Sequence, residues 1–215
     1  MAWDLLEENF ADLTDWTDGD SGSAVSEISP AGQLHQSASG TDIAIIYKAE
    51  DFTSDWTVEF KFLLDTVPTN DVDWYSGYFT GDTNQIFFKI SASGLYIHDG
   101  AAHNLVVSKT WVVDTWYTIR FIAHNSQTDC DVYIDNSLEA SDADMSFSAY
   151  PNSGFYANAA QSVSAEWHID YLYIGAGQIT PSTSSIKKVS GVAHASIKKI
   201  GGVAIGSIKK ISGVE

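Results

Sequence analysis

Apolar and polar residues alternate with a period of two through most of residues 1–184. In the segment 56–62 (WTVEFKF), aromatic and branched apolar residues occupy every second position, and threonine, glutamate and lysine lie between them. This alternation predicts a β-strand with one buried face, because successive side chains of a strand point to opposite sides. Alternation and a high content of β-branched and aromatic residues also predict strands at residues 43–47, 85–90, 95–97, 116–122, 131–134 and 168–174.

Turn-forming residues separate neighbouring predicted strands. The segment 91–94 (SASG) lies between Ile90 and Leu95, and Asp135-Asn136 follows Ile134. These spacings and compositions are typical of β-hairpins, which join antiparallel strands. No window of this region has a convincing helical period, and one face of each sheet must be covered. The sequence therefore predicts an all-β fold with two antiparallel sheets packed as a sandwich.

Composition favours a folded domain. Of the 215 residues, 44% are hydrophobic and 13% are aromatic, which excludes the disordered class. Cys130 is the only cysteine, so neither a disulfide within the chain nor a cysteine-based zinc site is expected, and we expect a small buried thiol. The opening residues lack the basic and apolar runs of a Sec signal peptide, and no apolar stretch is long enough to predict a membrane span.

The net charge of −17 conceals two segments of opposite sign. Residues 1–184 contain five basic and 27 acidic side chains, a net charge of −22, whereas residues 185–215 contain six lysines and Glu215, a net charge of +5. This division predicts an acidic body over residues 1–178, a linker at 179–184 and a basic tail at 185–215.

The tail contains three repeats with a period of 11 residues, which begin at Ser185, Ser196 and Ser207. Its glycines oppose a helix, so we expect extended segments punctuated by Ser-Gly and Gly-Gly turns. Short strands need a partner, and we expect the tail to pack against another copy of the chain or another protein, unless its lysines only solubilise exposed edges. We expect no nucleic acid as a partner, because the acidic body would repel it. The packing positions are Ile186, Val189, Ile197, Ile200, Ile208 and Ile211.

The order of the elements resembles the laminin-G-like, or concanavalin-A-like, jelly roll over residues 5–176. The matching elements are residues 8–12 with Trp16, the strands at 56–62 and 116–120, the hairpin at 132–136 and the closing strand at 169–174. The resemblance implies a jelly-roll sandwich, a fold that hosts lectins, carbohydrate-binding modules, glycanases, lyases and structural domains. The tail strings resemble tandem repeats of bacteriophage and environmental bacterial virion-type proteins.

Catalytic residues are not assigned. Glycanases of the resembled superfamily carry Glu-x-Asp-x-x-Glu on one strand, so that the carboxylates flank the scissile bond. That string is absent: Lys61 stands at the aspartate position after Glu59, and the interval from Glu166 to Asp170 is wrong. His98 and His103 lie near an aspartate, but we interpret them as solvated loop residues rather than zinc ligands.

Two loops are candidate binding sites. Trp74 and Tyr75 offer rings on which a sugar can stack, and Asp71 and Asp73 offer carboxylates that accept sugar hydroxyls, although a sandwich core also consumes aromatic residues.

A second loop carries Asp15, Asp18 and Asp20, which supply the oxygen ligands that calcium prefers. Many members of the resembled superfamily hold a structural calcium near their chain ends, and a solvated acidic loop is the alternative. The protein is expected to require no other cofactor.

The leading hypothesis is a non-enzymatic phage virion structural protein used for decoration, as a fibre, or for host-surface attachment. Its jelly-roll body would be displayed and its tail would anchor it in an oligomer or particle, which is extracellular after lysis. The alternative is a carbohydrate-binding module that binds cell-surface glycan, and a second alternative is a glycanase or polysaccharide lyase. Export to a bacterial cell surface by a non-Sec route is the alternative location.

Overall fold

The computed structural model has two compact units, residues 1–179 and residues 180–215. The described residues are 3, 5–49, 55–69, 74–78, 87–98, 102–124, 128–145, 152–158, 165–181, 188–189, 192–193, 199–200 and 203–204. Among them there is no helix, and hence none with the length and apolar character needed to cross a membrane.

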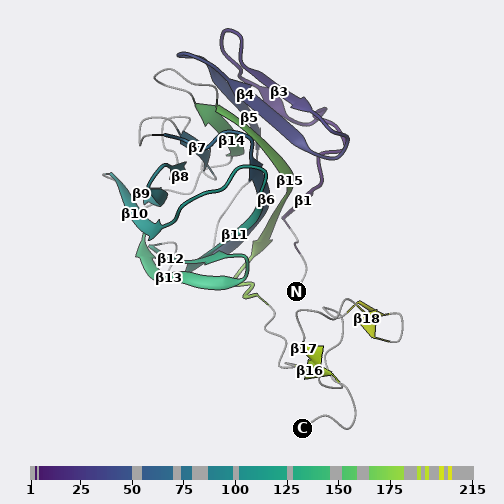
Figure 1. Cartoon of the computed structure of the whole chain (residues 1–215), viewed down its shortest axis with the longest axis vertical. Coiled ribbons are helices and arrows are strands. Elements are labelled where there is room, and N and C mark those ends of the chain that lie inside the picture. The colour runs from purple at the N-terminus through teal and green to yellow at the C-terminus, as the bar shows by residue number, and fades with distance from the viewer. Residues whose placement is uncertain are drawn as a thin grey trace. The chain divides into compact units, whose positions relative to one another are not determined.

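An eight-stranded antiparallel sheet forms one layer of the first unit. Its order is β13-β12-β11-β6-β15-β4-β3, and β1 pairs with the second half of β15. Figure 1 shows β3 and β4 at one end of this unit and β12 and β13 at the other. The strands are β1 (Leu6–Glu8), β3 (Val25–Ile28), β4 (Leu34–Ala38), β6 (Trp56–Leu64), β11 (Trp116–His124), β12 (Asp129–Ile134), β13 (Ser137–Asp144) and β15 (Ala165–Ala176).

A seven-stranded antiparallel sheet forms the other layer, in the order β10-β9-β8-β7-β14-β5-β2. The strands are β2 (Thr17–Asp18), β5 (Ile43–Ala49), β7 (Trp74–Tyr78), β8 (Phe88–Ser91), β9 (Gly94–His98), β10 (His103–Ser108) and β14 (Asn152–Asn158). The predicted all-β jelly-roll sandwich with two antiparallel sheets is confirmed.

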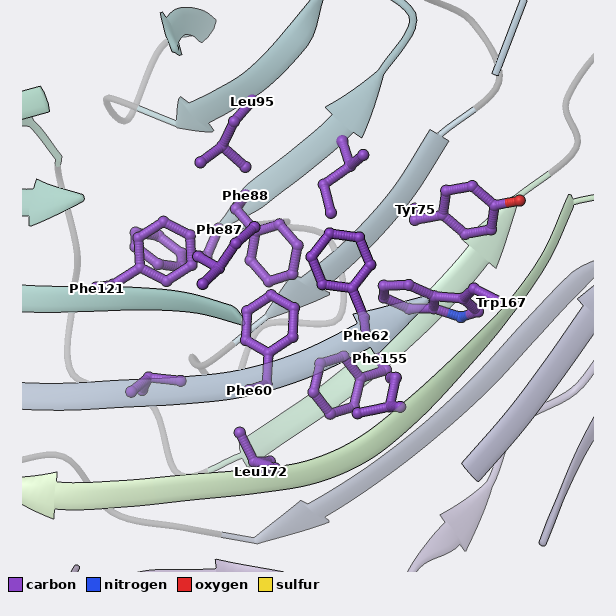
Figure 2. Packing of buried hydrophobic residues seen from close by; sticks show 14 of the residues in the cluster. Phe60, Phe62, Tyr75, Phe87, Phe88, Leu95, Phe121, Phe155, Trp167 and Leu172 are labelled. Atoms are coloured by element: carbon purple, nitrogen blue, oxygen red, sulfur yellow. The ribbon is translucent and has the colours of Figure 1, made fainter. Parts of the chain in front are cut away.

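Aromatic side chains fill the space between the two sheets. Phe60 and Phe62 of β6 and Trp167 of β15 point toward rings from the seven-stranded sheet (Figure 2). The Phe60 ring centroid lies 5.0 Å from that of Phe88, and the Trp167 centroid lies 5.0 Å from that of Tyr75. The alternation of the sequence therefore becomes a division between core residues and outward residues.

The predicted hairpin turns are confirmed. Asp135 and Asn136 join β12 to β13 and have φ values of 52° and 66°. Two successive residues with positive φ match a two-residue type I′ turn, which aspartate and asparagine tolerate. Residues 92–93 join β8 to β9. Cys130 is buried as expected, and burial raises the pKa of its thiol.

The second unit contains two short hairpins. β16 (Lys188–Val189) pairs with β17 (Val192–Ala193), and β18 (Lys199–Ile200) pairs with β19 (Val203–Ala204). The predicted extended segments are confirmed at these two repeats. Val189 and Ile200, two of the predicted packing positions, lie in these strands. The other four, Ile186, Ile197, Ile208 and Ile211, lie outside the described residues.

Two glycines with positive φ make a matched test of the packing at the edge of the seven-stranded sheet. At Gly94 (φ +140°), an added Cβ would lie 2.0 Å from the Val107 carbonyl oxygen, whereas at Gly40 (φ +64°) it would meet nothing within 4 Å. We expect Gly94→Ala to lower the free energy of unfolding by about 3 kcal/mol and Gly40→Ala by about 1 kcal/mol. Urea unfolding measures both, and equal losses would contradict the described β9–β10 contact.

Candidate functional site

The outer face of the eight-stranded sheet carries charged and aromatic side chains. Residues that alternate with the buried positions of β4, β6, β11 and β15 point away from the core. These outward residues include His35, Glu59, Lys61, Leu63, Trp116, Thr118, Arg120, Glu166, His168, Tyr171 and Tyr173. We call this surface the outer face.

Strand register aligns some of these residues in a row across five strands. Trp116 of β11 pairs with Leu63 of β6, which also pairs with His168 of β15. His168 in turn pairs with His35 of β4, and His35 pairs with Glu27 of β3. Two histidines from distant parts of the sequence are thereby neighbours on one surface.

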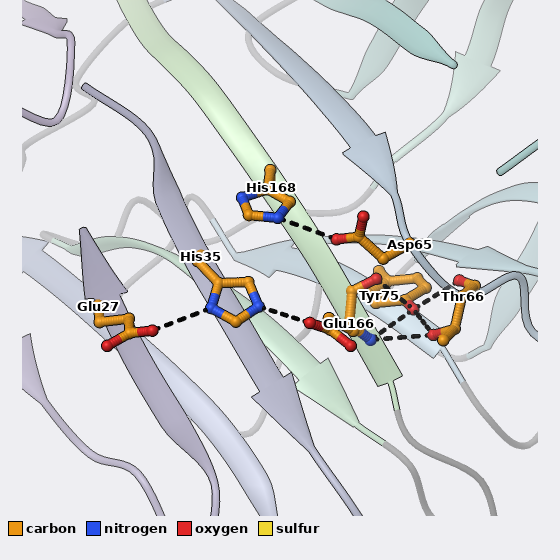
Figure 3. A network of polar contacts seen from close by, with 7 residues as sticks. All are labelled: Glu27, His35, Asp65, Thr66, Tyr75, Glu166 and His168. Atoms are coloured by element: carbon orange, nitrogen blue, oxygen red, sulfur yellow. Dashed lines mark hydrogen bonds and ion pairs between the residues drawn. The ribbon is translucent and has the colours of Figure 1, made fainter. Parts of the chain in front are cut away.

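Carboxylates surround these two histidines (Figure 3). His35 Nε2 lies 2.9 Å from Glu166 Oε1, and His35 Nδ1 lies 3.3 Å from Glu27 Oε1. His168 Nε2 lies 3.0 Å from Asp65 Oδ2, and the two imidazole rings stack with their centroids 4.6 Å apart. We call these five residues the histidine cluster.

A buried tyrosine from the opposite sheet fixes the backbone beneath the histidine cluster. The Glu166 N–H donates to the Tyr75 hydroxyl oxygen at 2.8 Å and to Thr66 Oγ1 at 3.0 Å. The Tyr75 hydroxyl lies 2.6 Å from the Thr66 carbonyl oxygen, and the Asp65 N–H donates to the Glu166 carbonyl at 3.0 Å. These bonds hold the residues after β6 against the start of β15.

This position corrects the prediction for Tyr75. Its side chain is only 1% exposed and packs on Trp167, so it offers no open face to a sugar. The alternation of β7 turns Tyr75 into the core, where burial raises the pKa of its hydroxyl. Trp74 lies in β7 opposite Asn158, but its side chain lies outside the described residues, as do Asp71 and Asp73. Those three assignments stay predictions.

Of the predicted calcium ligands, Asp18 lies in β2, Asp15 precedes this strand and Asp20 follows it. Asp18 Oδ1 accepts the Asp20 N–H at 2.8 Å, and Asp20 Oδ1 accepts the Ile45 N–H at 2.6 Å. Asp15 lies 3.9 Å from the Lys48 ammonium. Within the described part of the chain, these three carboxylates are not among the groups whose ligand atoms lie within 4.8 Å of one another. The calcium site stays a prediction.

Asp65 has an unusual environment for a carboxylate. Burial raises the pKa of its carboxyl group above the ordinary value, and the His168 and His35 imidazoles oppose that rise. Ionised Asp65 is therefore desolvated in the folded protein without full compensation.

An ion pair joins β6 and β11 on the outer face. Arg120 Nε donates to Glu59 Oε2 at 2.6 Å, and the Tyr171 hydroxyl donates to Glu59 Oε1 at 3.0 Å. Arg120 also donates to the Ile179 carbonyl at 3.1 Å. The Glu59 and Arg120 side chains are only 10% and 11% exposed, so this pair is largely desolvated. Burial and the Glu59 charge raise the pKa of Tyr171.

A β-bulge brings polar and aromatic groups together nearby. The register of β15 against β6 shifts between Ile169 and Tyr171, so Asp170 and Tyr171 both face outward. Asp170 Oδ2 therefore reaches Lys61 Nζ at 2.6 Å.

Three partly exposed rings lie around this bulge. Lys61 Nζ lies 4.5 Å from the centre of the Trp116 ring, and the Tyr171 and Tyr173 rings stack 4.4 Å apart. We call Trp116, Tyr171 and Tyr173 the aromatic strip.

The histidine cluster was not predicted from the sequence. His35 and His168 each occupy an outward position in an alternating segment, but no local spacing indicates that the two segments pair. The prediction that His98 and His103 are loop residues is wrong: they are half-buried, lie opposite each other in β9 and β10, and have rings 4.8 Å apart.

Comparison with solved structures identifies proteins that share this fold. No protein-family model and no curated protein matches the chain. The carbohydrate recognition domain of Emp47p matches with a TM-score of 0.58 at 14% identity, over 80% of this chain and 94% of its own. The carbohydrate-binding module CBM66 from Bacillus subtilis matches with a TM-score of 0.54 at 16% identity, over 76% and 96%.

An alginate lyase from Corynebacterium sp. matches with a TM-score of 0.57 at 14% identity, over 78% of this chain and 97% of its own. At such identities the likeness shows the fold alone, a lectin-like jelly-roll sandwich. This agrees with the concanavalin-A-like and laminin-G-like resemblance of the body. None of these three structures is described as a virion component, so the phage resemblance of the tail stays a prediction.

The Glu59–Arg120 pair gives a stability test of the outer face. Arg120→Met leaves a desolvated carboxylate without its cation, and we expect it to lower the free energy of unfolding by about 3–5 kcal/mol. Lys61→Met is the matched control, because Lys61 and Asp170 are each 32% exposed and such pairs contribute about 0–1 kcal/mol. Chemical denaturation of both variants measures the difference. Similar losses in the two would show that Glu59 is not desolvated.

Proposed function

We propose that the jelly-roll body is a non-catalytic carbohydrate-binding domain and that its ligand lies across the aromatic strip on the outer face. The observation that carries this proposal is the combination of partly exposed rings with charged groups beside them. Trp116 and Tyr171 flank Lys61, and Asp170 is bound to the same lysine.

This combination suits a sugar ring. The apolar face of a sugar stacks on aromatic side chains, and its hydroxyl groups need donors and acceptors at the edge of the stack. Lys61 supplies a donor, Asp170 supplies an acceptor, and the Tyr173 hydroxyl, which donates to Asn9 at 2.8 Å, can accept. The strands hold all of these groups on a rigid sheet, which limits the entropy lost on binding.

The two carboxylates that the sequence singled out support binding rather than glycoside hydrolysis. Hydrolysis needs one carboxyl group that stays protonated and a second that faces the scissile bond. Glu59 is instead paired with Arg120, and Glu166 lies against His35. Each carboxylate is thus already engaged by a neighbouring side chain of the sheet.

The structures that share the fold also favour this function, since two of the three named above are described as carbohydrate-recognition or carbohydrate-binding domains. The tail adds a separate proposal. Its repeats would attach the body to other copies or to another protein, in a virion or at a bacterial cell surface. Displayed in that way, a carbohydrate-binding body would reach cell-surface glycan.

A glycan array followed by titration of the best ligand tests the carbohydrate proposal. Trp116→Ala and Tyr173→Ala each remove a stacking surface, and we expect each to weaken binding about tenfold or more. Tyr96→Ala is the matched control, because Tyr96 is also partly exposed and also lies beside a lysine, with Lys89 Nζ 5.5 Å from its ring centre, but on the seven-stranded sheet. We expect it to leave affinity unchanged.

The array and the variants separate two ways in which the proposal fails. No glycan bound above background would remove the carbohydrate function. A bound glycan whose affinity falls with Tyr96→Ala and not with the two outer-face variants would move the site to the other sheet.

A further inference from the structure

We propose that His35, His168 and Asp65 form a binding site for a divalent transition-metal ion of the zinc class. The proposal stands on a convergence of side chains from three elements: His35 from β4, His168 from β15 and Asp65 directly after β6. It is independent of carbohydrate binding, because it uses none of the residues of the aromatic strip.

The geometry suits such an ion. One ligand atom from each of the three residues can be chosen so that all lie within 4.8 Å of one another. Tetrahedral zinc holds nitrogen and oxygen ligands at about 2.0–2.1 Å, which places them about 3.3 Å apart. His168 Nε2 and Asp65 Oδ2 are 3.0 Å apart, so two of the three ligand atoms already have nearly this spacing. In Figure 3, the Nε2 edges of both rings face the side on which Asp65 and Glu166 lie.

Two polar atoms in this group lack hydrogen bonds. Asp65 Oδ2 and His168 Nδ1 are buried and have no hydrogen-bond partner in the described part of the chain. Asp65 Oδ2 therefore lies 3.0 Å from His168 Nε2 without the geometry of a hydrogen bond. Buried polar atoms without partners are costly, and a metal bound by Asp65 Oδ2 would satisfy that oxygen.

The surrounding carboxylates match the second shell of a metal site. Histidine ligands usually donate their other ring N–H to a carboxylate, which orients the ring and raises its basicity. His35 has a carboxylate at each nitrogen, Glu27 at Nδ1 and Glu166 at Nε2. Whichever nitrogen binds the metal, the other keeps a carboxylate as acceptor.

The donor set selects the class of metal. Two imidazoles and one carboxylate favour zinc, cobalt, nickel or copper, whereas calcium and magnesium prefer oxygen ligands. Three protein ligands leave a fourth position for water or for an oxygen of a bound molecule.

A second group of possible ligands is less suitable. His124, Asp131 and Asp142 also lie within reach of one another, but this group has one imidazole, and the Asp142 side chain is 76% exposed. His124 therefore supplies a control for the proposed site.

Titration of the chelator-treated full chain with zinc chloride tests the proposal by calorimetry, and cobalt chloride gives a spectroscopic readout of coordination. We expect one zinc ion per chain and the intense visible absorption of cobalt in a tetrahedral site. His35→Gln and His168→Gln each remove a ligand, so each is expected to weaken zinc binding more than tenfold and to abolish the cobalt spectrum. His124→Gln and His103→Gln are expected to bind both metals as the wild type does.

Thermal unfolding separates a lost ligand from a lost fold. Zinc should raise the melting temperature of the wild type and of the two control variants, while His35→Gln and His168→Gln should show cooperative unfolding that zinc does not shift. A wild-type protein that does not bind zinc would overturn the proposal. So would binding that survives both ligand variants, or binding lost only with His124→Gln. In those cases the histidine cluster is a set of ion pairs between imidazoles and carboxylates.

Discussion

The pairing of β15 with β6 on one side and with β4 on the other is the constraint on which both faces of the sandwich depend. β15 is 12 residues long, and its register places Trp167 and Leu172 in the core while His168 and Tyr173 point outward. A slip of one residue would exchange these sets, burying a histidine and exposing a tryptophan, so the aromatic core enforces the register. The bulge at Asp170 then keeps both ends of the strand in phase with the core.

The polar groups of the outer face differ in how completely their hydrogen bonds are satisfied. The Glu59–Arg120 pair is desolvated, bonded to Tyr171 and tied to the Ile179 carbonyl, which suits a structural role at the end of the body. The histidine cluster combines burial with unsatisfied atoms at Asp65 and His168, a combination that a purely structural network avoids. The aromatic strip lies on the same outer face, so one surface carries both the proposed ligand site and the proposed metal site.

The features that were predicted correctly from the sequence depend on patterns within a few neighbouring residues. The strands, the turn at Asp135-Asn136 and the buried Cys130 follow from alternation and turn chemistry within a few residues. The sheet order and the register depend on contacts between distant segments, so nothing local could indicate that His35 lies beside His168. Alternation also leaves the choice of face open: either Trp74 or Tyr75 could have pointed inward, and only packing against Trp167 places Tyr75 in the core.

The central claim is that ligands bind this protein on the outer face of the eight-stranded sheet. The most direct test is to map the backbone amide chemical shifts while the protein is titrated with an oligosaccharide selected on the glycan array. The account predicts that the largest shift changes cluster on β6, β11 and β15 around Lys61, Trp116 and Tyr171. Changes concentrated on β7, β8 and β9 of the seven-stranded sheet would contradict it.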